Sequence, residues 1–259
     1  MSFRIDKHLI GDVKVPSDAY YGPFTVRAVS QYAVTGQRVH PDLIRAYAMI
    51  KKSAALVNME LNVLDKAKGC AIIRSCDEIL EKKLEDQIII DAINSGAGTA
   101  LNMNINEVIA NRALEIFGKR KGEYDFINPN DHVNMSQSSN DTIPTAMQIA
   151  IIFNVTETIS ALKDLTMTLN KKAEEFKDAI KIGRTHLMDA LPVTLGIEFG
   201  TYAYSLEIAR KELFHAAHNL TYVGLGGTAV GTGANTPKGF SKVATQHLAE
   251  ISRLDLRPS

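Results

Sequence analysis

The chain has 259 residues, of which 45% are hydrophobic, and its 29 lysines and arginines balance 29 aspartates and glutamates. These values are typical of a globular protein with one large or two ordinary domains. The balanced charge argues against a nucleic-acid partner or an anionic membrane surface. The N-terminus shows no apolar signal segment, and the longest apolar runs, such as Ile88–Ile90, are too short to span a bilayer.

Cysteine usage indicates a reducing compartment. Cys70 and Cys76 lie six residues apart, with no other cysteine or histidine grouped near them. This spacing fits neither a zinc site nor a redox pair. We expect two helix-buried thiols in a cytoplasmic protein, with no metal site and no organic cofactor.

The first half of the chain predicts helices after a turn-rich start. Residues 1–40 read as extended and turn-rich because glycine, proline and aspartate punctuate them. A helix is expected from Pro41, where apolar residues recur at three- and four-residue steps through Leu61. Two more helices are expected over 67–80 and 99–117, the latter ending at Gly118.

The second half predicts longer helices. One helical pattern runs from Asp141 to Phe176 and another from Pro192 to Leu220, with a break at 183–186 and a short helix near Ser241. Helices of this length are typical of a long bundle. We therefore predict an all-α fold with an N-terminal domain over 1–138 and a long-helix domain over 139–259.

Small and polar residues crowd two segments of the predicted bundle. The first is Ser95-Gly-Ala-Gly-Thr99, followed by Asn102 and Asn106 on one face of the third helix. These asparagines could form a polar wall facing a substrate, or hydrogen bonds between helices. The second is Ser136-Gln-Ser-Ser-Asn-Asp141, before the longest helix. One residue suffices for a helix cap, so the crowding favours a site where the helix N-terminus binds an anion such as a carboxylate.

A third segment, Gly183-Arg-Thr-His186, combines a cation, a hydroxyl and an imidazole at a helix break. Histidine can donate to an oxyanion or transfer a proton near neutral pH, although a salt bridge and a buried histidine explain the segment equally well. The glycine-rich stretch 224–233 does not fit a nucleotide-binding loop, because a helix precedes it and the third glycine of the fingerprint falls on Ala229. We expect a tight loop that closes over a neighbouring site.

Taken in order, these segments resemble the fumarase/aspartase superfamily of lyases over essentially the whole chain. The matching stretches are Val15-Pro-Ser-Asp-Ala-Tyr-Tyr-Gly22, Gly96-Ala-Gly-Thr99, the segment 102–112, Asn128-Pro-Asn-Asp-His-Val-Asn134, Ser136–Asp141, Gly183–His186 and Gly231-Thr-Gly233. Within the superfamily, hydratases usually carry histidine at the place of Asn128 and aspartate at the place of His132. The chain is therefore more similar to the aspartase branch, while the class II fumarase branch stays the alternative.

The resemblance implies reversible anti elimination of ammonia from L-aspartate to give fumarate through an aci-carboxylate intermediate. Carried over by position, Thr99, Ser138, Ser139, Asn140, Thr185 and His186 would hold the two carboxylates of a small dicarboxylate substrate. Ser138 to Asn140 would also offer backbone N–H groups. Thr185 and His186 would be catalytic in a neighbouring subunit's site, because the family forms homotetramers with sites shared between subunits.

The chain departs from the family pattern in one respect. The family's third conserved segment, a mobile loop that supplies the serine base and a carboxylate-binding lysine, would follow Ser259. The resemblance therefore implies that the chain alone is inactive, as the first part of a longer or split enzyme with an incomplete bundle. A non-catalytic helical protein that reuses the fold is the competing expectation.

Overall fold

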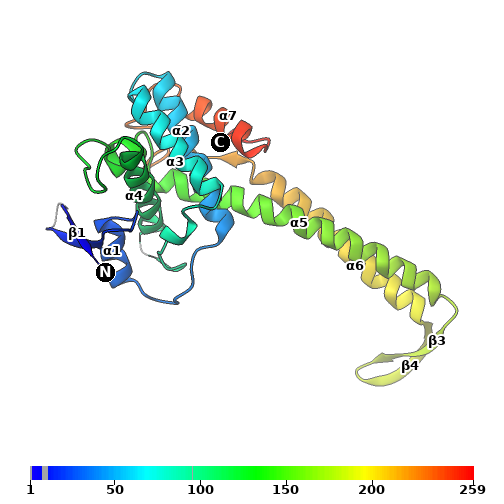
Figure 1. Ribbon diagram of the computed structural model, residues 1–259. Helices are drawn as coiled ribbons and strands as arrows, with labels where there is room; N and C mark the ends of the chain where they lie inside the picture. Colours follow the sequence, from blue (N-terminus) through cyan, green and yellow to red (C-terminus); the bar gives the residue numbers. More distant parts are fainter. Residues whose placement is uncertain (1, 8–10, 95) are drawn as a thin grey trace. The chain divides into compact units, whose positions relative to one another are not determined.

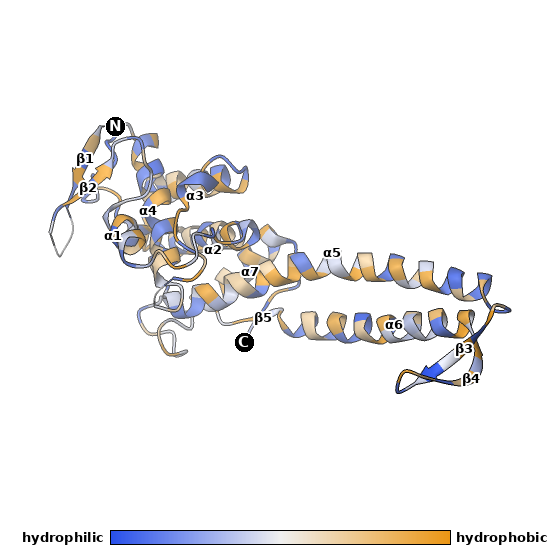
Figure 2. Ribbon diagram, turned by 90° about the horizontal axis from the view of Figure 1, so that it is seen from below, coloured by the Kyte–Doolittle hydropathy of each residue, from blue (hydrophilic) through white to orange (hydrophobic). Residues whose placement is uncertain are grey.

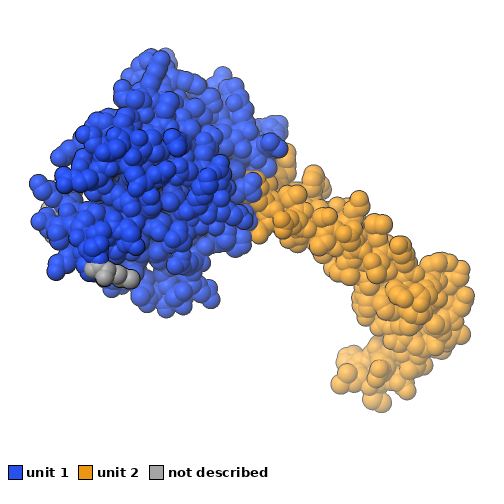
Figure 3. Space-filling model, viewed as in Figure 1, with its two compact units in different colours: residues 1–150, 221–259 blue, residues 151–220 orange. Residues whose placement is uncertain are grey.

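The computed structural model describes residues 2–7, 11–94 and 96–259. They form two compact units, one of residues 1–150 with 221–259 and the other of residues 151–220 (Figure 3). This division differs from the boundary expected at residue 138, because the segment after residue 220 returns to the first unit, where Ser53 Oγ donates to the Ala244 carbonyl at 2.6 Å. The expected domain boundary stays a prediction.

The first unit consists mainly of helices (Figure 1). Its elements are β1 Phe3–Asp6, β2 Val13–Pro16, α1 Pro23–Gln31, α2 Pro41–Glu60, α3 Lys66–Leu80, the 3₁₀ turn η1 Glu85–Gln87, α4 Thr99–Ile116, the π-helical turn η2 Pro129–Val133, the start of α5 Ser139–Glu175, β5 Tyr222–Val223, α7 Phe240–Ser252 and β6 Arg257–Pro258. The strands form only two-stranded pairs, so the expected all-α class is confirmed.

The helices expected after residue 40 form close to their predicted bounds. Pro41 occupies the first turn of α2, and Asp65 caps α3 by accepting from the Lys68 N–H at 3.0 Å. The core lies between α2, α3 and α4, where Tyr47, Ile50 and Ile109 are fully buried. Periodic apolar residues and ordinary caps suffice to define these helices.

The expectation of an extended, turn-rich segment over residues 1–40 holds for two short strands but missed a helix. β1 pairs with β2, and residues 23–31 form α1. The carboxylate of Glu107 caps this helix by accepting from the N–H groups of Gly22, Phe24 and Thr25 at 2.8–3.0 Å. Gly22 and Pro23 indicate a turn locally, and the cap that makes them a helix start lies on α4.

The second unit contains the remainder of α5, the antiparallel strands β3 Ile180–Thr185 and β4 Met188–Thr194, and α6 Leu195–Asn219. The expected break at 183–186 is therefore a β-hairpin, and α6 begins later than Pro192 because Thr194 caps it, accepting from the Ile197 N–H at 3.2 Å. Figure 2 shows hydrophobic residues spaced along α5 and α6 between polar ones. Many of them are exposed, including Tyr204 and Phe214.

The expectation of two buried thiols needs correction. Cys76 is buried but Cys70 is exposed, because Cys70 lies on the outer face of α3. No uninterrupted apolar run in the sequence is long enough to span a bilayer. By length and average composition, α5 alone among the described helices could nevertheless cross a membrane. A window average tolerates scattered polar residues, and a long helix of a soluble bundle passes the same test. The property therefore does not indicate a membrane.

Candidate functional site

The loop before α5 places the predicted serines at the helix N-terminus. Ser138 and Ser139 are half-buried, and Asn140 is exposed. Ser138 Oγ accepts from the Asn140 N–H at 3.2 Å, and Ser139 Oγ accepts from Asn102 Nδ2 at 3.2 Å. Neither hydroxyl donates its own proton to an acceptor within the described part of the chain. Both O–H groups are therefore available as donors to an anion near the positive end of the helix.

The backbone of this loop offers less than we expected. The Ser138 N–H donates to Asp141 Oδ1 at 3.0 Å, and the Asn140 N–H donates to Ser138 Oγ. Of the three backbone N–H groups at residues 138–140, only that of Ser139 lacks such a partner within the described residues. The expected set of three backbone donors is therefore reduced to one, because local side chains cap the other two.

Thr99 is the first residue of α4, and Asn102, one turn further on, bonds to Ser139. Gly98 precedes Thr99 with a φ of 87°, and a side chain there would collide with Ile143 of α5. This close approach brings the start of α4 against the start of α5. The Thr99 hydroxyl donates to the Gly96 carbonyl at 2.7 Å, so its lone pairs remain for an incoming donor. Ser95 lies outside the described residues.

The asparagine-rich face of α4 forms hydrogen bonds to the turn between η2 and α5 and to α2. Asn102 Nδ2 and Asn106 Nδ2 each donate to Asn134 Oδ1 at 3.2 Å. Asn102 Oδ1 in turn accepts from Lys51 Nζ at 2.7 Å. The asparagines of α4 thus bond to the loop before α5 at Asn134 and to the first residue of α5, Ser139. The bond from Asn102 to Ser139 is their one direct link to the predicted site residues.

Sequence reasoning missed Lys51, which lies on α2 and is fully buried. Its Nζ donates to Asn102 Oδ1 at 2.7 Å, Asn134 Oδ1 at 2.8 Å and Gln137 Oε1 at 2.9 Å. Burial lowers the pKa of Lys51 to about 7, and the negative charge of Asp141 opposes this shift. The available signal was a lysine four residues after Tyr47, on the face of α2 that also carries Ile44.

The glycine-rich loop closes against the start of α5, whereas its closure over a neighbouring site stays a prediction. The Gly226 and Thr228 N–H groups donate to Asp141 Oδ2 at 3.1 and 2.8 Å, and Asn140 Nδ2 donates to the Ala229 carbonyl at 2.8 Å. Burial raises the pKa of the Asp141 carboxyl, and the hydrogen bonds from Ser138 and Thr228 oppose that shift. The loop binds protein atoms at Asp141 instead of a phosphate.

Thr185 and His186 belong to the second unit, at the end of the β3–β4 hairpin. Both are exposed. Thr185 pairs with Met188, so His186 and Leu187 form a two-residue turn, with φ of 48° and 63°. Non-glycine residues rarely adopt this conformation, which holds the imidazole at the tip of the hairpin.

The two residues that favour the aspartase branch stabilise the π-helical turn η2. Asn128 Oδ1 accepts from the N–H groups of Asn130 and Asp131, at 2.7 and 3.1 Å. His132 Nδ1 accepts from the Asn128 N–H at 3.0 Å, and His132 Nε2 lies 3.1 Å from Lys68 Nζ. Within the first unit they shape a turn and make no hydrogen bond to Ser138, Ser139 or Asn140.

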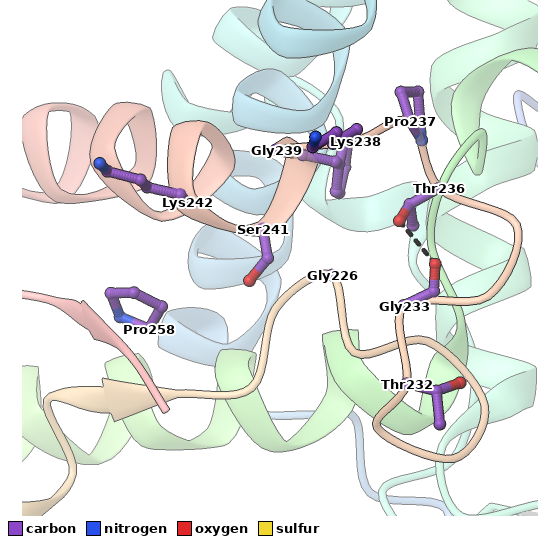
Figure 4. A pocket seen from close by; sticks show the side chains of 11 residues that line it. Gly226, Thr232, Gly233, Thr236, Pro237, Lys238, Gly239, Ser241, Lys242 and Pro258 are labelled. Carbon is purple, nitrogen blue, oxygen red and sulfur yellow. Dashed lines mark hydrogen bonds between the residues drawn. The ribbon is translucent and has the colours of Figure 1, made fainter.

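Two cavities lie beside the loops but contain none of the six predicted residues. One, of about 440 Å³, is lined by the glycine-rich loop and the start of α7 (Figure 4). Its Thr236 and Ser241 hydroxyls already donate to the carbonyls of Gly233 and Leu225. The other, of about 580 Å³, borders residues 134–137. The described residues contain no group of three or more histidine, cysteine, aspartate or glutamate side chains that could hold a metal.

Comparison with known proteins shows similarity to lyases over nearly the whole chain. Residues 11–258 match a family described as lyase. The chain is 48% identical over 254 residues to an aspartate ammonia-lyase from a Bacillus species, covering 98% of the chain and 54% of that relative. It is 46% identical over 256 residues to a class II fumarate hydratase from Pasteurella multocida, covering 98% and 55%.

The solved structure of a fumarate lyase:delta crystallin from Brucella melitensis matches with a TM-score of 0.95 and 42% identity, covering 100% of the chain and 56% of that structure's chain. The chain thus spans about half the length of the curated relatives it matches. The resemblance to the fumarase/aspartase superfamily is confirmed. Because the match extends over nearly all of its residues, the chain belongs to this lyase family.

Proposed function

We propose that the protein is an aspartate ammonia-lyase, which removes ammonia from L-aspartate by reversible anti elimination to give fumarate. One observation carries the proposal: two hydroxyls with undonated protons, Ser138 and Ser139, lie at the N-terminus of α5 in a chain 48% identical to an aspartate ammonia-lyase. A helix N-terminus with hydroxyl donors suits a carboxylate.

The reaction needs donors that act most strongly in the transition state. A base removes the proton beside one carboxylate, and the electron pair moves into that carboxylate, which then carries two negative charges on its oxygens. Preorganised donors stabilise this charge more than they stabilise the substrate. In the proposal, Ser138, Ser139 and Asn140 bind a carboxylate, with the Ser139 N–H as an additional donor. None of these residues is assigned the role of the base.

Thr99 takes a different part in the proposed site. Its hydroxyl proton is donated to Gly96, so its oxygen meets the substrate as an acceptor. An ammonium group carries three donors and no acceptor. We therefore assign Thr99 to the substrate's ammonium group instead of to a carboxylate, the role that the resemblance implied.

Thr185 and His186 would complete the site of a neighbouring subunit, within a homotetramer whose sites are shared. Their exposure at the tip of a hairpin supports this role, because the tip can reach another copy. The second unit also exposes large apolar side chains on α6, such as Ile197, Tyr204 and Phe214. Exposed apolar residues in such number favour association.

We also propose a cytoplasmic location, because two free cysteines suit a reducing compartment. The alternative function is that of a class II fumarate hydratase, with water in place of ammonia. The 46% identity to the class II fumarate hydratase from Pasteurella multocida supports this alternative. A non-catalytic helical protein is less well supported, because the serines at the start of α5 keep their donors available.

Ultraviolet absorbance of fumarate tests the proposal. The protein expressed from its complete reading frame is given L-aspartate or L-malate in parallel. Turnover of L-aspartate supports the ammonia-lyase, turnover of L-malate alone supports the hydratase, and no turnover of either contradicts both. Ser139→Ala should reduce kcat by about a hundredfold, whereas the surface control Ser30→Ala should have no effect. Asn140→Ala and His186→Ala should likewise reduce kcat more than they raise KM.

A further inference from the structure

Lys51 is fully buried, and in its protonated form all three of its ammonium protons bond to side-chain amides. An ammonium group has no acceptor, so each amide must turn its oxygen toward it. The orientations of Asn102, Asn134 and Gln137 are therefore fixed by the charge. The carboxylate of Asp141, whose negative charge favours the protonated form of Lys51, makes no hydrogen bond to Lys51 among the described residues.

The orientation of Asn102 determines that of Ser139. With its oxygen held by Lys51, Asn102 must turn its NH₂ group toward Asn134 Oδ1 and Ser139 Oγ, both at 3.2 Å. Ser139 Oγ thus accepts a hydrogen bond from inside the protein. Its own proton then points to an acceptor elsewhere, which the described residues do not supply.

We propose that Lys51 is a positioning residue that, through Asn102, holds the Ser139 hydroxyl as a hydrogen-bond donor to the substrate's carboxylate. This inference rests on the proposed function, because it requires an anion bound at Ser139. Lys51 touches no substrate. Its charge orients the Asn102 amide directly and, through that amide, the Ser139 hydroxyl.

Stability alone does not account for a lysine at this position. Replacing buried charged groups by apolar residues of similar volume is often neutral or stabilising in proteins. Lys51 lies about one turn after Tyr47 on α2, and both side chains are fully buried. A methionine could fill the same space, but it could not orient the three amides.

The first test reverses one hydrogen bond. In Asn102→Asp, one carboxylate oxygen still accepts from Lys51, while the other faces Ser139 and accepts its proton. The Ser139 donor then points inward. We expect kcat/KM for the turned-over substrate, L-aspartate or L-malate, to fall by about a hundredfold, as for Ser139→Ala.

The matched control is Asn104→Asp, a buried asparagine of the same helix. Asn104 Nδ2 donates to the Gln87 carbonyl at 3.1 Å, and its Oδ1 accepts from the Ile89 N–H at 2.9 Å. This substitution also places a carboxylate oxygen against an oxygen, without a link to Ser139. It should lower the melting temperature comparably and leave kcat/KM nearly unchanged.

A double-mutant cycle then tests Lys51 itself. If Lys51 acts through Ser139, Lys51→Met reduces kcat/KM strongly in the wild-type background and only slightly in the Ser139→Ala background. Lys52→Met, which removes the neighbouring lysine and its ion pair with Asp77, serves as the control. Circular dichroism and melting temperature establish that each variant is folded.

The outcomes separate this inference from the proposed function. Wild-type protein that turns over neither substrate contradicts the proposed function, and the inference is overturned with it. An active wild type with an unimpaired Asn102→Asp variant overturns the inference alone. So does a cycle in which the losses from Lys51→Met and Ser139→Ala multiply, because independent losses show a merely structural role for Lys51. If Lys51→Met does not fold, Asn102→Asp and its control decide the matter.

Discussion

The carboxylate of Asp141 accepts a 2.8 Å hydrogen bond from the backbone N–H of Thr228, 87 residues further along the chain. The same oxygen accepts from Gly226, and the other carboxylate oxygen accepts from Ser138. Asp141 is 2% exposed, so these bonds form away from water. One side chain therefore holds both the loop that carries the proposed carboxylate donors and the glycine-rich loop beside it.

Substitution of Asp141 by asparagine should destabilise the first unit. An amide in this place keeps one acceptor oxygen and directs an NH₂ group at a backbone N–H. We expect the free energy of unfolding to fall by about 1–3 kcal/mol, the usual cost of an unsatisfied buried polar group. Urea denaturation measures the change, with exposed Asp131→Asn as the control. An Asp141→Asn variant as stable as wild type would show that the carboxylate is not the anchor.

Substitution of Glu107 should destabilise α1, because its carboxylate caps the start of that helix. Its carboxylate accepts four hydrogen bonds, from the N–H groups of Gly22, Phe24 and Thr25 and from the Thr25 hydroxyl. Glu107→Gln replaces one acceptor by a donor and should cost about 1–3 kcal/mol of unfolding free energy. Glu115→Gln, on the exposed side of the same helix, should cost less. Hydrogen exchange of the α1 amides would show whether the loss is local, and unchanged protection would contradict the capping role.

Local sequence patterns were sufficient for most helices but not for α1 or the β3–β4 hairpin. The cap of α1 comes from Glu107, 85 residues after Gly22, so no local pattern contains it. The hairpin turns at His186 and Leu187, which are not ordinary residues for a tight turn. In both places the deciding interaction or conformation is one that residue propensity does not encode.

In the candidate site, too, some residues could be predicted from the local sequence and others only from the fold. Ser138, Ser139 and Asn140 could be found because more polar residues precede α5 than one helix cap requires. Lys51 could not, because adjacent Lys51 and Lys52 look alike in sequence. Only the fold turns one inward to three amides and leaves the other in an ion pair with Asp77. The sequence left the asparagines of α4 with two possible roles, and only the positions of Lys51 and Ser139 identify the hydrogen bonds of Asn102 to other helices.

The stability of the protein should rise with pH in the window where Lys51 titrates. Burial lowers the pKa of Lys51 from 10.5 to about 7, so above pH 7 the unfolded chain binds more protons than the folded one. The unfolding free energy then increases with pH by at most about 1.4 kcal/mol per unit. Above about pH 9 the raised pKa of buried Cys76 acts in the opposite sense.

Urea midpoints measured between about pH 7 and pH 9 test this sign. Lys51→Met should remove the increase, whereas Lys52→Met should preserve it. A midpoint that falls with pH in wild type would show that the three amide oxygens hold the proton on Lys51 more strongly than burial removes it.

His132 should titrate below its ordinary value of 6.5. Burial is the main cause, the charge of Lys68 adds to it, and Asp131 opposes both. Protonation would also remove the Nδ1 acceptor for the Asn128 N–H. Lys68→Met should therefore raise the pKa of His132, which an NMR titration of the ring protons measures, while Lys66→Met should not. Because the folded pKa is lowered, the stability that His132 contributes is lost as pH falls through it.

Association should depend on the apolar face of α6. Ile197, Tyr204 and Ile208 are exposed and lie at helical spacings that place them on one side. If this side packs against further helices in an assembly, Tyr204→Glu buries a charge there and should shift the protein to smaller species in sedimentation velocity. Ala209→Glu adds the same charge about 140° around the helix and is the control. Equal sedimentation of wild type and Tyr204→Glu would show that Tyr204 stays in water, and the subunit contact proposed for His186 would then have to use another face.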